Sequence, residues 1–91
     1  MIVNSAQVYD WGKKLQTIDL PVLAIYCYDC AMRNAQSNHI GLNSIISASQ
    51  LRLKHQFQID HAIQSLQYVQ SKYPQSMQAQ EATKTLAFFT R

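Results

Sequence analysis

Apolar residues recur at three- and four-residue spacing along most of the chain, the pattern of helices that bury one face. The most apolar stretch, Leu20–Ala35, is predicted to be a helix around which the other segments pack. Val22, Ile25 and Tyr26 make the outer side of its first half apolar too, so we expect this helix to be central to the fold or covered by a partner. Its predicted inward face comprises Leu20, Leu23, Ala24, Cys27, Ala31 and Ala35.

The outer side of the same segment also carries polar residues, namely Asp29, Arg33 and Gln36. Asp29 and Arg33 are four residues apart, a spacing at which opposite charges on a helix can pair. Val22, Tyr26 and Arg33 share this side, and binding hot spots favour Tyr and Arg. We therefore predict that Val22, Tyr26 and Arg33 belong to a protein contact surface.

A first helix is predicted over Asn4–Thr17, with Asn4 as its N-cap. Gly12 lies in its interior, where Gly costs about 1 kcal/mol relative to Ala, and this indicates close packing against another helix. Trp11, the single tryptophan, is expected to anchor the core. The predicted inward stripe is Val8, Trp11, Leu15 and Ile18.

Short polar residues mark the expected ends of the other helices. Asp19 is predicted to cap the second helix, and Asn38 or Gly41 to close it in the left-handed conformation. Pro74 ends the segment before the last helix, which Ser76 is predicted to cap. The inward stripe of this last helix is predicted to be Ala79, Ala82, Leu86 and Phe89.

The long segment Asn43–Tyr73 contains two apolar stripes that are out of phase by about 170 degrees on a helix. We predict a break within His55–Asp60, with Asp60 capping the second half, and a continuous helix buried on both sides is the alternative. The fold class is therefore all-α, a compact bundle of four to five helices with short connections, in a single domain over residues 1–91. The two stripes are Ile46, Leu53 and Phe57, then Ile59, Ala62, Ile63, Leu66, Val69 and Tyr73.

The chain is poor in charge, with 14% charged residues against about 25% in typical soluble proteins. Twelve Gln and eight Ser replace the missing charge, and a net charge of +3 with no basic run longer than two makes nucleic acid a less favoured partner than protein. The longest uncharged apolar run, Leu20–Tyr28, is half of a bilayer span, and the N-terminus lacks a basic signal region. We expect a cytoplasmic protein without a membrane partner.

Few residues of the chain suggest a catalytic, redox or metal-binding role. Cys27 and Cys30 form a CxxC inside a predicted helix, so buried thiols are favoured over a redox pair or half of a zinc site. His61 is expected to be a solvated side chain, and no acid pair, Gly-x-Ser-x-Gly context or glycine-rich phosphate loop is present. We expect no enzymatic activity, cofactor or metal. The aromatic residues are predicted to be mostly in the core, except Tyr26 and Tyr68 on outward faces.

Residues 43–76 resemble a single tetratricopeptide repeat, a helical hairpin of about 34 residues. Ala62 matches the family's small residue in the second helix, Leu66 its large apolar position and Pro74 its closing proline, and SKYPQSMQAQEA is similar to the family's wording between repeats. The first helix of the unit departs from the family's pattern, and neighbouring segments do not repeat it. The resemblance implies a binding scaffold without catalysis, whose binding surface would be Ser44, Ser47, Leu51, Lys54 and His55.

Together these features favour a small non-enzymatic protein-binding module, an adaptor or an inhibitor of a larger protein complex, as phage- or immunity-type antagonists are. A small DNA-associated regulator that uses the basic cluster of Arg52, Lys54 and His55 is one alternative, and a structural homodimer is another. The predicted protein-binding residues are Val22, Tyr26, Arg33, Arg52, Lys54 and His55.

Overall fold

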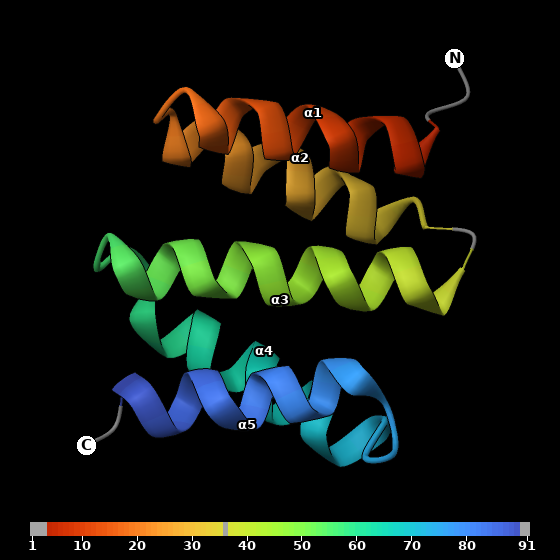
Figure 1. Cartoon of the computed structure of the whole chain (residues 1–91), viewed down its shortest axis with the longest axis vertical. Coiled ribbons are helices and arrows are strands. Elements are labelled where there is room, and N and C mark those ends of the chain that lie inside the picture. Colours follow the sequence, from red (N-terminus) through yellow and green to blue (C-terminus); the bar gives the residue numbers. More distant parts are fainter. Residues whose placement is uncertain (1–3, 36, 90–91) are drawn as a thin grey trace.

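The computed structural model describes residues 4–35 and 37–89, and this part of the chain contains five helices and no strand. The all-α fold of four to five helices with short connections is confirmed (Figure 1). The helices are α1 (Ser5–Thr17), α2 (Pro21–Arg33), α3 (Asn38–Lys54), α4 (Ile59–Lys72) and α5 (Met77–Phe89).

The helices form two layers, with α1, α3 and α5 side by side in one layer and α2 and α4 behind it (Figure 1). The α1–α2 hairpin packs on one side of α3, and α4 and α5 pack on the other. Because α3 alone contacts all four other helices, it is the central helix. The prediction that Leu20–Ala35 has this position is therefore wrong.

The interior consists of two apolar clusters that meet at α3. Leu42, Ile46 and Leu53 of α3 pack with α4 and α5. Ala48 and Leu51 of the same helix pack with α1 and α2. A helix that is buried on both sides has apolar residues around most of its circumference, as expected for a central element.

Several helix boundaries follow from the predicted signals. The Asn4 side chain accepts a hydrogen bond from the backbone N–H of Gln7 at 3.2 Å, and the Ser76 hydroxyl accepts one from the N–H of Ala79 at 3.0 Å. The predicted break is also confirmed, since α3 ends at Lys54 and α4 begins at Ile59. Asp60, however, is not the cap of α4, because it lies within the first turn and Gln58 is the N-cap.

Two other predicted helix ends are wrong. Asp19 has a left-handed backbone (φ 62°) and precedes Leu20, which is the N-cap of α2 without a side-chain hydrogen bond. Neither Asn38 nor Gly41 has a positive φ, because α2 already ends at Arg33 and both residues belong to α3. The N-cap of α3 is Ser37, whose hydroxyl accepts a hydrogen bond from Ile40 N–H at 3.3 Å.

The orientation of α2 also differs from the predicted one. Ile25 and Tyr28 are buried, whereas Leu20 and Leu23 of the predicted inward face are exposed. The cause is the close contact between α1 and α2 at Gly12, where the Tyr28 ring lies against the glycine. This contact confirms the role predicted for Gly12, and it turns Tyr28 inward and Leu23 outward.

Candidate protein-binding surface

The exposed side of the α1–α2 hairpin is unusually apolar. Tyr26 is 71% exposed, Leu23 52% and Trp11 48%. Val22 is also more than half exposed, so four large side chains of two helices lie open. We call this surface of Trp11, Val22, Leu23 and Tyr26 the hairpin face.

Trp11 is therefore not the core anchor that its spacing predicts. Its helix turns Val8 and Gly12 inward, and the tryptophan ring borders the surface. The prediction of mostly buried aromatic residues is likewise wrong for the three phenylalanines, which are exposed, whereas the outward positions of Tyr26 and Tyr68 are confirmed. The phenylalanines are Phe57, Phe88 and Phe89.

One hollow next to Tyr26 is an apolar groove of about 400 Å³ between α1 and α2. Its lining is almost wholly apolar. Because the groove lies between two helices that are already packed together, an inserted apolar side chain would contact both. The lining residues are Val8, Trp11, Leu15, Leu23, Tyr26, Cys27 and Cys30.

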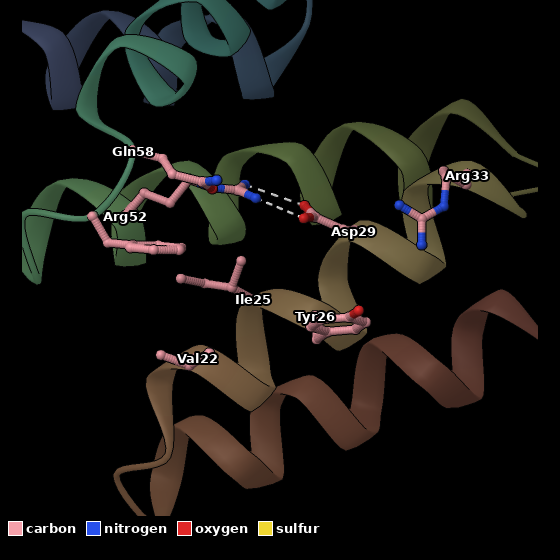
Figure 2. Close-up of a pocket in the computed structure, with 8 residues that line it drawn as sticks. Val22, Ile25, Tyr26, Asp29, Arg33, Arg52 and Gln58 are labelled. Atoms are coloured by element: carbon pink, nitrogen blue, oxygen red, sulfur yellow. Dashed lines mark hydrogen bonds and ion pairs between the residues drawn. The ribbon is translucent and has the colours of Figure 1, made fainter.

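A second hollow, of about 310 Å³, lies on the other side of Tyr26, between α2 and the end of α3 (Figure 2). Four of the six predicted binding residues line it, so the structure brings together residues that are up to thirty positions apart in the chain. Tyr26 borders both hollows and therefore separates them. The lining residues are Val22, Ile25, Tyr26, Asp29, Arg33, Arg52, Phe57 and Gln58.

An ion pair between the buried Arg52 and the half-buried Asp29 lines this second hollow. Nη2 and Nη1 of Arg52 lie 2.6 and 3.2 Å from the two carboxylate oxygens of Asp29, and Arg52 Nε donates to Gln58 Oε1 at 2.9 Å. The arginine is only 5% exposed. Asp29 thus pairs with Arg52 and not with Arg33, whose side chain lies on the far side of Asp29 (Figure 2).

The Asp29–Arg52 ion pair separates Arg52 from the other two residues of the predicted basic cluster, Lys54 and His55. The Arg52 side chain lines the hollow between α2 and the end of α3, whereas Lys54 and His55 are exposed to solvent. Lys54 lines a different hollow, of about 480 Å³, together with Lys84 of α5. The three residues therefore do not form one basic surface, because the Arg52 guanidinium is engaged by Asp29 and Gln58.

The surface that the tetratricopeptide resemblance implies is partly covered. Ser44 and Leu51 of α3 are buried, and Leu51 belongs to the cluster that α3 shares with α1 and α2. Lys54 and His55 remain exposed. In this fold, the hairpin face is thus the more open apolar surface.

Cys27 and Cys30 are free thiols inside α2, half-buried along the apolar groove. Burial raises the pKa of the Cys27 thiol, and the neighbouring Cys30 raises it further. A redox-active CxxC has the opposite shift at its attacking cysteine. Within residues 4–35 and 37–89, no group of three His, Cys, Asp or Glu side chains is placed to hold a metal ion.

Sequence reasoning missed Trp11 and Leu23 as surface residues because their spacing matches an inward stripe. The signal that could have found Leu23 is the apolar character of the first half of α2 on nearly all sides, since a helix of that kind that is not central leaves an apolar side uncovered. Comparisons with family models, curated proteins and solved structures gave no significant match. No helix in the described ranges has the length and apolar character required to cross a membrane.

Proposed function

We propose that this chain is a small non-enzymatic protein-binding module, an adaptor or an inhibitor of a larger protein complex, and that the hairpin face is its binding surface. The observation that carries the proposal is the position of α2. The first half of this helix is apolar on nearly all sides, yet the helix lies at the side of the molecule and not at its centre. A helix of this kind is expected to have a partner on its open side.

The geometry of the face supports the same function. Binding hot spots are enriched in Trp, Tyr and Arg, and the face offers Trp11 and Tyr26 with Arg33 at its border. Hollows on both sides of Tyr26 provide space for side chains of a partner. The Asp29–Arg52 pair fixes α2 against α3, so the face is preorganised.

The DNA-associated alternative has less support. Its three predicted residues do not share one surface, because Arg52 is buried against Asp29. Lys54 and His55 remain available, but two positive side chains neutralise few phosphates. A phage- or immunity-type role and a cytoplasmic location stay predictions from the sequence.

The test is an affinity pull-down of the tagged chain from its native host lysate at moderate salt, analysed by mass spectrometry. Tyr26→Glu places a charge on the hairpin face, and Tyr68→Glu is the matched control on α4, since Tyr68 is also exposed. The proposal predicts a protein complex that wild type and Tyr68→Glu retain and Tyr26→Glu loses. Equal recovery by all three would contradict the role of the hairpin face.

A second result of the same pull-down decides between adaptor and structural roles. Recovery of nothing except the untagged chain would remove the adaptor and inhibitor functions and leave self-assembly. Helical circular dichroism of each variant serves as the folding control, because both substitutions are at exposed positions.

A further inference from the structure

We infer that a second copy of this chain covers the hairpin face in the absence of another partner. The two α2 helices would run antiparallel, related by a two-fold axis that passes near Tyr26. The inference rests on the proposed function, because it names an occupant for the same surface. Copy and target would then compete for the face.

The charge of the α1–α2 hairpin favours a second copy over a strongly charged partner as the occupant of the hairpin face. The α1–α2 hairpin has no net charge, so the net charge of +3 belongs to the remainder of the chain. Arg52 of α3, which pairs with Asp29, raises the net charge of this surface only to +1, so two hairpins can approach with little electrostatic repulsion, whereas a strongly acidic or basic partner finds little complementary excess. The charged residues of the hairpin are Asp10, Asp19 and Asp29, and Lys13, Lys14 and Arg33.

The charges at the two ends of α2 favour the antiparallel arrangement. Asp19 lies in the turn before α2, seven residues before Tyr26, and Arg33 is the last residue of α2, seven residues after Tyr26; both are exposed. A two-fold axis at Tyr26 therefore places Asp19 near Arg33 of the partner subunit, and the reverse contact follows from symmetry. A parallel arrangement would instead oppose like charges at both ends.

The hairpin face has room for side chains of a second copy on both sides of Tyr26. Tyr26 projects between two hollows, one of about 310 Å³ and one of about 400 Å³. Because the axis passes near Tyr26, the two Tyr26 side chains meet at the axis, and each hollow faces the same hollow of the other copy, as in an isologous interface. The apolar residues Val22 and Leu23 lie between the charged ends and would pack across the axis.

The area indicates a dimer that dissociates on dilution. An aromatic side chain presents about 150 to 250 Å² in total, so the exposed parts of Trp11 (48%) and Tyr26 (71%) supply about 200 to 300 Å² per copy. With Val22, Leu23 and the groove walls, two copies would bury about 1,000 Å², at the low end of specific interfaces. Such a complex can exchange its second copy for another partner.

The test is sedimentation equilibrium of the full chain from about 1 µM to about 1 mM, a range that covers weak dimers. The monomer mass is 10.4 kDa, and we expect twice this mass at the upper concentrations. Arg33→Glu and Asp19→Lys should each weaken association about tenfold, because each homodimer then has two like-charge contacts. An equimolar mixture of these two variants should associate as wild type does.

A second variant keeps the test decisive, since Asp19 has a left-handed backbone that Lys adopts poorly. Asn tolerates this conformation, so Asp19→Asn/Arg33→Glu should associate more tightly than Arg33→Glu alone. A wild-type mass of 10.4 kDa at every concentration would overturn the inference, and so would a mixture no tighter than its components. Neither result decides the proposed function, which is tested separately by the Tyr26-dependent capture of another protein.

Discussion

Gly12 of α1 lies directly against the ring of Tyr28 in α2: a β-carbon built on the glycine would be 2.7 Å from Tyr28 Cε1 and 2.8 Å from Cδ1. The ring cannot easily move away, because its hydroxyl donates a hydrogen bond to Gln16 Oε1 at 2.8 Å and its centroid is 5.4 Å from that of Tyr9. This contact determines how closely α1 and α2 approach. It also determines which side of α2 is left open.

Gly12→Ala should therefore destabilise the protein despite the higher helix propensity of Ala. Overpacking of a core typically costs about 1 to 3 kcal/mol, and the propensity gain offsets about 1 kcal/mol, so we expect a net loss of up to about 2 kcal/mol. Urea unfolding followed by circular dichroism measures it. Gly41→Ala is the control, since its added β-carbon would lie 3.4 Å from Ala35 Cβ, and a stabilised Gly12→Ala would contradict the contact.

Alkaline pH should weaken the same contact. Burial raises the pKa of Tyr28 to about 12, with smaller contributions from Tyr9 and Cys27. Because the folded pKa lies above the ordinary value of 10, the stability linked to the protonated phenol is complete below pH 10 and is lost as pH rises through 12. Urea unfolding between pH 9 and pH 12 should show this loss, and Tyr28→Phe should show a smaller one. Equal pH dependence of both proteins would contradict the prediction.

The Asp29–Arg52 pair should contribute strongly to stability when one partner is removed. Asp29→Ala leaves the buried guanidinium of Arg52 without its carboxylate, and breaking a buried pair in this way costs about 3 kcal/mol. The double variant Asp29→Ala/Arg52→Leu should be less destabilised than Asp29→Ala alone, because no uncompensated charge remains. Denaturant midpoints of the three proteins provide the comparison. A cost below about 1 kcal/mol for Asp29→Ala would indicate that water replaces the carboxylate.

Ser49 should be dispensable, in contrast to Ser44, five residues earlier on the same helix. Its buried hydroxyl oxygen has no hydrogen-bond partner among the residues that the structure describes, whereas the Ser44 hydroxyl donates to Ile40 O at 2.7 Å. Ser49→Ala removes an unpaired polar group, so stability should stay unchanged or rise by about 1 kcal/mol. Ser44→Ala is the matched control on the same helix. A loss of more than about 1 kcal/mol in Ser49→Ala alone would show that the hydroxyl is bonded in solution.

The features that the sequence predicted correctly depend on short stretches of chain. Asn4 and Ser76 cap their helices through bonds to residues three positions away. The break between α3 and α4 follows from a phase difference between neighbouring stripes. Local chemistry is sufficient in each of these cases.

The features that were missed depend on contacts between helices. The central position of α3 was not predicted because the polar residues Ser44 and Ser49 interrupt its apolar pattern. Both are buried, since small residues allow neighbouring helices to approach. The Asp29–Arg52 pair joins residues 23 positions apart, so no i,i+4 rule could find it. The rotation of α2 depends on Tyr28 packing against Gly12.

The predictions for the candidate site also divide into those that depend on one helix and those that depend on contacts between helices. The shared stripe of Val22, Tyr26 and Arg33 follows from helical spacing within α2, and these residues do line one hollow. Trp11 belongs to another helix and joins the surface only through the packing of α1 against α2. Lys54 and His55 were grouped with Arg52 by adjacency, which does not determine side-chain direction.

The fluorescence of Trp11 tests most directly whether a protein covers the hairpin face. The chain has one tryptophan, and it is about half exposed on that face. Acrylamide quenching should decrease as the chain is concentrated or as the captured target is added, with Tyr26→Glu unchanged under the same conditions. Quenching that stays constant in wild type, both with concentration and with the target, would contradict the account.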